Sequence, residues 1–435
     1  MTEPQARRQP GGDTPLRAWP VDRGPAVAAP RPTRRPLREV LARARSEAVL
    51  RWVQLRPAAQ ALLIYLASRV FDFVILDRAA RFQPASLWNG PDPGYLGLVS
   101  LWDGDWYRIV AENGYPDTLP VDPSSGLVRQ NAWAFYPLFP LVTRGLMTTT
   151  GLRWPLAASI VTLSCAAVAV VVLRSLLAPL VGTELALWGV ALFCFFPAAP
   201  VLQLAYTEGM AALLLFSVFW CLQRGRYLAA VPLVLMLGFT RALAAPLAAV
   251  VALHLLRSLV HRDRAAGGRR ILSQLLLAAA ACVAVVEWPL TAGWVTGRRS
   301  AYLDTMGAWR SSHQVTSFRP WLDISRFFFG YWFGPVGLTV ILLALVVWLR
   351  SSRTVPIGPD LRLWSALYAG YLLAVLDPGT SIFRYCLMFF PLGVLLAAAS
   401  SSRAYRTALV VASAAGQVVW VVWLWRFIPP SDWPP

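Results

Sequence analysis

The sequence predicts an all-α polytopic membrane protein. Apolar residues make up 57% of the 435 residues and charged residues only 14%, a composition that no soluble domain of this size needs. Stretches long enough for a transmembrane helix, roughly 20 mostly apolar residues each, recur from Pro57 to Ile428. The basic residues are all arginines and stand mainly in short clusters between these stretches, as the positive-inside rule describes. We therefore expect an integral plasma-membrane protein, and the net charge of +18 does not indicate nucleic-acid binding.

The N-terminal segment has a different composition from the rest of the chain. Residues 1–56 are rich in Pro, Gly, Ala and Arg, with twelve arginines against five acidic residues. We expect a disordered basic cytoplasmic tail that ends in a short amphipathic helix at the membrane surface. The segment lacks the apolar core and cleavage site of a secretory signal peptide, so we expect it to persist in the mature protein.

Residues 57–428 are expected to form the membrane domain, followed by a short external tail at 429–435. Twelve apolar segments are visible, at roughly 57–77, 133–150, 155–174, 184–201, 204–222, 227–241, 243–260, 271–291, 327–349, 362–376, 383–400 and 407–428. We place four arginine clusters in the cytoplasm together with the N-terminus. These clusters are Arg224/Arg226, 261–270, Arg350/Arg353 and Arg403/Arg406.

Counting crossings forward from the tail and backward from Arg224 gives opposite sides for the chain between them. The conflict disappears if segment 133–150 enters the membrane and returns on the same side. Pro137 and Pro140 favour this, because they remove backbone donors and break a helix. Eleven crossings result; the alternative is that another of the twelve segments is miscounted.

Two external loops are long, about 78–132 and about 292–326, and both are rich in Trp, Tyr, Pro and Gly. Aromatic rings of this kind settle at the membrane interface. Long ordered loops on a rigid scaffold often carry function, so we expect the functional site on the external face.

The first of these loops contains two carboxylates among large aromatic rings, Asp103 and Asp105, within the run Trp102-Asp103-Gly104-Asp105-Trp106-Tyr107. Neighbouring carboxylates in an aromatic setting suit general base catalysis, in which one takes a proton while the other stays charged. The alternative is an interfacial turn whose aspartates cap a short helix through 108–113.

Several ionisable residues lie within the apolar segments, where a charge near mid-membrane costs at least ~2.5 kcal/mol. Arg69 and Asp72 stand three residues apart on one helical face and are expected to neutralise each other. Glu208, Arg241 and Arg384 have no such local partner. We expect them to take part in function or in a long-range ion pair; the alternative for Glu208 and Arg384 is a place at the membrane interface.

Arginine suits a phosphate ligand, because its planar fork donates two hydrogen bonds at once and stays charged. Arg241 and Arg384 with Tyr385 are therefore candidate binders of an anionic lipid head group. For Tyr385, as for most aromatics here, the alternative is packing in the membrane belt. His313 in the second external loop is a weaker candidate that is expected either to donate to substrate or to be solvated. The cysteines and histidines show no metal-ligand spacing and the sequence has no nucleotide-binding motif, so we expect neither metal nor cofactor.

Short motifs along residues 57–400 resemble, in order and approximate spacing, the PIG-V family of glycosyltransferases with the GT-C fold. They are Trp-Asp-x-Asp at 102–105, Gly-Tyr-Pro at 114–116, Phe-Tyr-Pro-Leu-Phe-Pro at 135–140, Phe-Pro-Ala at 196–198, Tyr-Thr-Glu at 206–208, Gly-Arg-Tyr at 225–227, Thr-Arg at 240–241, and Arg-Tyr at 384–385 with Phe-Phe-Pro at 389–391.

The resemblance implies a GT-C-like bundle of about 11–12 transmembrane segments with a long helical first external loop. It also implies an inverting transferase that moves mannose, or a similar hexose, from a polyprenyl-phosphate donor to a lipid, glycan or protein acceptor on the non-cytoplasmic face, without metal. Asp103 matches the family's characteristic acid and is the expected base, with Asp105 assisting. Arg241, Arg384 and Tyr385 would bind the donor phosphate. The expected substrate-binding residues are Trp102, Trp106, Tyr107, Tyr206, Glu208 and His313.

A secondary transporter or lipid flippase is the main alternative function. Glu208, Arg241 and Glu287 would then lie along a polar path through the bundle. Transporters typically contain paired repeats with broken helices in matching positions, and the sequence shows no convincing internal repeat. A scaffold subunit without chemistry would not need the two aspartates among aromatic rings or the arginines without local partners.

Overall fold

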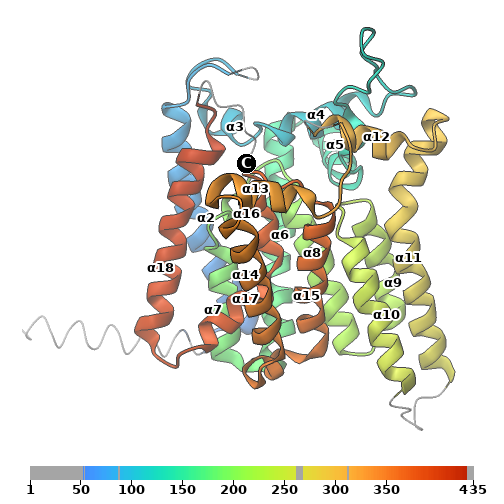
Figure 1. Cartoon of the computed structure of the whole chain (residues 1–435). Helices are drawn as coiled ribbons and strands as arrows, with labels where there is room; N and C mark the ends of the chain where they lie inside the picture. Colours follow the sequence, from blue (N-terminus) through green and yellow to red (C-terminus); the bar gives the residue numbers. More distant parts are fainter. Residues whose placement is uncertain (1–51, 53, 87–88, 261–267, 311–312, 429–435) are drawn as a thin grey trace, which may run out of the picture. The chain divides into compact units, whose positions relative to one another are not determined.

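The computed structural model describes residues 52, 54–86, 89–260, 268–310 and 313–428. Within these ranges the regular structure is helical, apart from isolated bridge residues that include the antiparallel pair Val121 and Val128, and it includes seventeen α-helices, α2–α18 (Figure 1). The expectations for the N-terminal tail and for 429–435 fall almost wholly on residues outside these ranges.

The apolar helices confirm the prediction of an all-α polytopic membrane protein. Five are long and apolar enough to cross a membrane: α2 (Pro57–Arg81), α6 (Trp154–Val181), α11 (Gly268–Thr296), α14 (Phe333–Arg350) and α18 (Arg403–Trp420), which the π-helical turn η5 (Val421–Trp425) continues. Four more apolar helices are shorter: α7 (Thr183–Cys194), α8 (Glu208–Gln223), α9 (Tyr227–Gly238) and α10 (Ala244–Val260). Helix α15 (Gly358–Val375) packs against α10.

Helix α5 (Leu138–Thr150) bears on the number of crossings. Its 13 residues do not decide this by length, because α7 and α9, with 12 residues each, are as short. It lies at the same end of the bundle as α4 (Asp103–Asn113) and α12 (Ala301–Ala308), as Figure 1 shows. The backbone N–H of Leu138, at its start, donates to the carbonyl of Phe239 at 2.9 Å. This geometry supports the re-entrant interpretation of segment 133–150.

Three non-helical or irregular stretches separate apolar helices, and each is longer than the gap that the sequence predicted there. Residues 195–207 separate α7 from α8 and contain only the short turn η2 (Ala199–Leu202). Residues 239–243 separate α9 from α10. Residues 376–389 separate α15 from α17 (Phe390–Ala398) and hold α16 (Ile382–Tyr385) and η4 (Cys386–Met388). The predicted helices 184–201, 227–241 and 383–400 were therefore wrong at these breaks.

Arg69 of α2 stabilises the first break. Its guanidinium donates to the carbonyls of Cys194 and Ala199, at 3.1 and 3.0 Å, and so satisfies acceptors that the end of α7 leaves free. The Asp72 carboxylate lies 2.8 Å from the same guanidinium, which confirms the predicted neutralising pair. This pair therefore has a structural role.

Close packing of α6 and α8 fixes the other side of this break. Gly209 follows Glu208, and a Cβ atom at this glycine would lie 2.8 Å from the carbonyl oxygen of Thr162. The Thr162 hydroxyl donates to the carbonyl of Tyr206 at 3.1 Å. The first turn of α8 is thus held directly against α6.

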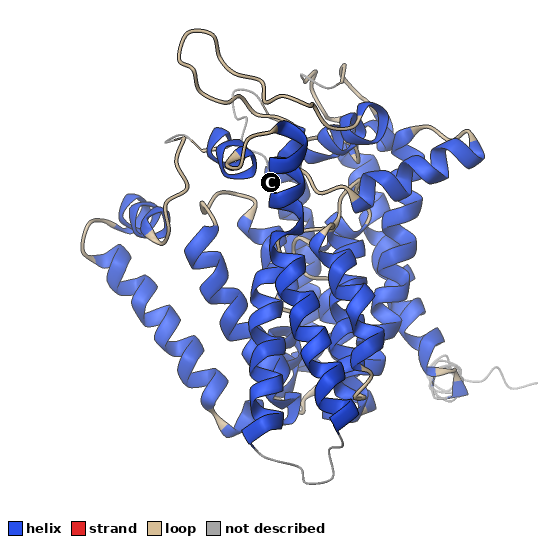
Figure 2. Ribbon diagram, turned by 90° about the vertical axis from the view of Figure 1, so that its right-hand side faces the viewer, coloured by secondary structure: helices blue, strands red, loops and turns tan. Residues whose placement is uncertain are grey.

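The two ends of the bundle differ. The longer connections, with α3 (Gly94–Leu98), α4, η1 (Ala132–Ala134) and α12, gather at the upper end in Figure 1, and the loops at this end are also the larger ones in Figure 2. The first of these connections, about 78–132, contains α3 and α4. It is therefore helical in part, as expected for the first external loop. At the lower end the links from α8 to α9, from α14 through η3 (Ser352–Ile357) to α15, and from α17 to α18 are short. Arginines lie in the first two links and in the first turn of α18, at Arg403 and Arg406. Of the cluster 261–270, residues 261–267 lie outside the described ranges.

Candidate active site

Helix α4 begins at Asp103, and the residue before it holds this start in place. Trp102 has φ 60° and ψ −124°, a left-handed conformation that is uncommon for a residue other than glycine. Its buried indole donates to the carbonyl of Trp425 in η5 at 2.7 Å. The backbone N–H of Asp103 donates to the hydroxyl of Tyr206 at 3.1 Å. The chain is therefore fixed on both sides of the Asp103 carboxylate.

Four charged side chains from different segments form one ion network. Arg384 Nη1 lies 2.7 Å from Asp103 Oδ2 and 3.6 Å from Glu208 Oε1. Arg241 Nη1 lies 2.6 Å from the same Glu208 oxygen and also donates to the Thr207 hydroxyl at 3.1 Å. Two carboxylates thus balance two guanidiniums, as a buried cluster requires. These contacts bring together the starts of α4 and α8 with the breaks at 239–243 and 376–389.

Exposure distinguishes the members of this network. The Glu208 side chain is fully buried at 0%, whereas that of Asp103 is 15% exposed, the largest value of the four. Asp103 is therefore the carboxylate that a bound molecule can reach, and Glu208 is the one that holds the arginines.

Aromatic rings enclose the arginines. The Arg384 guanidinium lies 5.1 Å from the ring centre of Tyr206 and 5.3 Å from that of Tyr385, and Arg241 lies 4.7 Å from the Tyr385 ring. Such contacts favour a cation in a dry setting. Tyr107 of α4 lies edge-on to Tyr206, and burial raises the pKa of Tyr107 above its ordinary value, so its hydroxyl stays neutral.

Three predicted residues lie away from this network. The Asp105 carboxylate pairs with Arg108 at 2.7 Å on another face of α4. Trp106 stacks on Phe135, with ring centres 5.5 Å apart. His313 is exposed in the second loop. The structure therefore gathers Asp103, Tyr107, Tyr206, Glu208, Arg241, Arg384 and Tyr385, places Trp102 behind Asp103, and leaves Asp105, Trp106 and His313 in other contacts.

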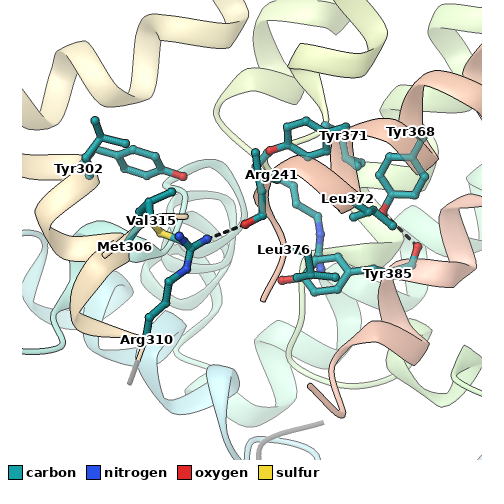
Figure 3. Close-up of a pocket in the computed structure, with 14 residues that line it drawn as sticks. Arg241, Tyr302, Met306, Arg310, Val315, Tyr368, Tyr371, Leu372, Leu376 and Tyr385 are labelled. Atoms are coloured by element: carbon teal, nitrogen blue, oxygen red, sulfur yellow. Dashed lines mark hydrogen bonds between the residues drawn. The ribbon is translucent and has the colours of Figure 1, made fainter. Parts of the chain in front are cut away.

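A cavity adjoins the network between the start of α10, α12 and α15 (Figure 3). Arg241 and Tyr385 line it together with residues that no sequence motif indicated, among them Tyr302, Arg310 and Tyr371. One sequence feature could have indicated Arg310 as a site residue. It is an arginine in a loop that is expected outside, which the positive-inside rule disfavours. No sequence feature could have indicated the tyrosines, because aromatic residues are common throughout the chain. In the part of the chain that the structure describes, no three His, Cys, Asp or Glu side chains are grouped so as to hold a metal ion.

Comparison with known proteins gives partial matches. The chain is similar to GPI alpha-1,6-mannosyltransferase 2 of Mus musculus, with 29% identity over 184 residues, which cover 38% of this chain and 34% of that protein. The same protein of Cricetulus griseus gives the same values, and that of Homo sapiens is 28% identical over the same length. The match thus spans about a third of the length of these relatives. No protein-family model matches the chain. These relatives confirm the resemblance that the motifs indicated.

Proposed function

We propose that this chain, which resembles the PIG-V family of mannosyltransferases over part of its length, is a membrane glycosyltransferase. It transfers mannose or a similar hexose from a polyprenyl-phosphate donor to an acceptor hydroxyl, on the non-cytoplasmic face. The observation that carries the proposal is the ion network, in which Asp103 is paired with Arg384 and still partly exposed. The names of these relatives support mannose as the sugar and transfer as the reaction.

The proposed reaction uses Asp103 as general base. Its carboxylate takes the proton of the acceptor hydroxyl while the acceptor oxygen forms a bond to the anomeric carbon of the sugar. The bond from that carbon to the phosphate oxygen breaks, its electron pair stays on the phosphate, and the anomeric centre is inverted. Arg384 and Arg241 stabilise the negative charge that develops on the leaving phosphate.

The orientation of the site is part of the same proposal. The arginine-bearing links at the lower end of the bundle are cytoplasmic under the positive-inside rule. The end with α3, α4 and α12 then faces the other side of the membrane. With α5 re-entrant, the eleven remaining crossings bring Asp103 and Glu208 to the same face.

The test uses purified protein, radiolabelled polyprenyl-phosphate-mannose and a membrane extract as acceptor. We expect the wild type to transfer sugar and Asp103→Asn to lose at least about a hundredfold in rate, in line with the loss of a general base. Asp105→Asn is the matched control, because its carboxylate pairs with Arg108 outside the network, and we expect a small effect. The melting temperature of each variant shows whether it is folded.

Two outcomes contradict the proposal. Full activity of Asp103→Asn would remove Asp103 from the mechanism. Absence of transfer from any lipid-linked sugar, with wild-type protein that is folded, would favour the transporter or flippase alternative.

A further inference from the structure

A groove lies between α2 and α18, on a side of the bundle away from the candidate active site. In Figure 1 these two helices form one side of the bundle, whereas the cavity beside the ion network lies toward α10, α12 and α15. The groove has apolar walls and one arginine from each side. Its lining residues are Val74, Ile75, Arg78, Ala79 and Phe82 on the side of α2, and Val418, Val422 and Arg426 on the side of α18 and η5. None of them belongs to the ion network or to the cavity beside it.

The two arginines of this groove have no acidic partner. The Arg78 guanidinium lies 5.7 Å from the ring centre of Phe82, and Arg426 donates through Nη2 to the carbonyl of Phe82. Among the described residues, neither arginine forms an ion pair with a carboxylate. Arg81, in the same last turn of α2, is by contrast neutralised by Asp77 at 2.7 Å. The groove therefore carries two positive charges that the protein does not balance.

The surroundings of these arginines favour an anionic ligand. Both lie at the end of the bundle that carries α4 and is expected outside, where the positive-inside rule disfavours arginine. Arg78 is exposed and Arg426 is half-buried, and Nη1 of Arg426 makes no hydrogen bond within the described ranges. Guanidinium groups on apolar stems settle at the level of lipid head groups, and they bind phosphate oxygens through paired hydrogen bonds.

The apolar walls favour a lipid over a free anion. Both α2 and α18 are long and apolar enough to cross a membrane, and Val74 and Val418 on their surfaces are exposed. Val74 lies about one turn below Arg78, and Val418 lies about two turns below Arg426. A ligand whose anionic group meets the arginines can thus extend an apolar chain along the same groove toward the middle of the membrane.

The groove is also joined to the start of α4. Arg426 follows Trp425, whose backbone carbonyl accepts from the indole of Trp102. Gln83, after the end of α2, exchanges two hydrogen bonds with the backbone of Phe427, at 2.8 and 3.2 Å. A ligand held by arginines from both sides would therefore fasten the end of α2 to the segment that positions Trp102.

We propose that this groove binds an anionic phospholipid of the surrounding membrane. The head-group phosphate lies between Arg78 and Arg426, and one acyl chain lies against the apolar wall. The phosphate lowers the net positive charge of the groove, whereas a choline head group would bring a third cation to it. The site is distinct from the proposed reaction, so it stands or falls without any sugar transfer.

Lipid binding by the purified protein tests the proposal. The protein in dodecyl maltoside, which carries no phosphate, is titrated with dioleoyl phosphatidylglycerol, dioleoyl phosphatidylcholine or inorganic phosphate, and native mass spectrometry counts the bound lipids. We expect the first phosphatidylglycerol to bind about tenfold or more tightly than phosphatidylcholine, and Arg78→Gln to lose about fivefold in affinity for it. Arg81→Gln is the matched control: it removes the same charge from the same turn, and Arg81 does not line the groove, so binding should not change.

Four results would overturn the proposal. Equal affinity of the wild type for the two lipids would show that the groove does not distinguish head-group charge. Unchanged binding of phosphatidylglycerol by Arg78→Gln would remove this arginine from the site. Equal loss in Arg81→Gln would show a general charge effect. Full competition by millimolar inorganic phosphate would show a site for free phosphate and not for a lipid.

Two further variants test the acyl chain and the second arginine. Val418→Trp narrows the groove and leaves both arginines in place; we expect it to bind both lipids about fivefold more weakly, and unchanged affinity contradicts the place of the chain. Arg426→Gln should lose affinity for phosphatidylglycerol as Arg78→Gln does, but it also loses the hydrogen bond to Phe82, so its melting temperature is measured first. Arg78 makes no hydrogen bond within the described ranges, so Arg78→Gln decides the question if Arg426→Gln does not fold.

Discussion

Glu208 is the residue on which the ion network depends, since one of its oxygens lies between two guanidiniums. It is 2.6 Å from Arg241 and 3.6 Å from Arg384, and it is fully buried. Removing one member of a buried charged pair leaves the other uncompensated, which is far more costly than losing an exposed pair. Glu208 therefore stabilises the fold as well as the arrangement of the site.

We expect Glu208→Gln to lower the stability of the folded protein by about 3 kcal/mol or more, because the charge of Arg241 is then left without its closest partner. The measurement is the melting temperature in detergent. Glu184→Gln is the control: Glu184 is 60% exposed and pairs with Arg406 near the opposite end, so the melting temperature should not change.

The double variant Glu208→Gln with Arg241→Gln should be more stable than Glu208→Gln alone, since it removes the uncompensated charge. Equal melting temperatures for wild type and Glu208→Gln would show that the network contributes no stability.

Residues of the site could be identified from the sequence where a charged side chain stands in an apolar segment. Glu208, Arg241 and Arg384 stand out as charges in apolar segments, and they do meet in the structure. Asp105 was grouped with Asp103 because the two are close in sequence. On a helix, however, residues two apart point about 200° from each other, so only one can face the network.

At the scale of elements, the interrupted helices explain how charged side chains reach the interior of the bundle. The sequence predicted where apolar segments lie, and each contains a helix. It did not predict how far the breaks at 195–207 and 376–389 extend, since the predicted segments 184–201 and 383–400 run into them. Arg69, bound to carbonyls at the end of α7, acts across 125 residues of sequence, and no local pattern shows such a contact.

The π-helical turn η5 is a second element that the sequence did not predict, and π-helical turns are frequent at functional sites. Its Trp425 is fully buried. The indole donates to the carbonyl of Leu98 at 3.0 Å, the backbone carbonyl accepts from Trp102, and the ring lies 5.3 Å from that of Tyr206. Trp425 therefore contacts both residues that hold Asp103 in position.

We expect Trp425→Phe to lower kcat for sugar transfer about tenfold and to change KM for the donor little, because the lost hydrogen bond to Leu98 loosens the start of α4 without touching the cavity. Initial rates over a range of donor concentrations give both constants. Trp423→Phe is the control in the same turn, since Trp423 is 75% exposed, and its rates should match the wild type. A rise in KM with unchanged kcat would show that Trp425 acts on donor binding and not on Asp103.

For the whole molecule, the sidedness of the bundle decides whether the residues of the site act together. Two counts of the crossings follow from the positions of the arginine clusters, and length and composition alone do not choose between them. The place of α5 beside α4 and α12, at one end of the bundle, supplies the missing argument. A tertiary position of this kind depends on contacts such as that of Leu138 with Phe239, which are 101 residues apart in sequence.

This topology predicts which positions a membrane-impermeant maleimide reaches in intact cells. Cysteines are placed singly at three exposed sites, by Ser124→Cys in the first external loop, Thr149→Cys at the end of α5, and Ser401→Cys between α17 and α18. Cys282 is exposed and is first replaced by alanine. We expect labelling of the first two positions in intact cells and of Ser401→Cys only after permeabilisation, because the re-entrant α5 returns to the side of α4. Labelling of Thr149→Cys only after permeabilisation would mean that α5 crosses the membrane, and labelling of Ser401→Cys in intact cells would reverse the orientation and move the proposed site to the cytoplasmic face.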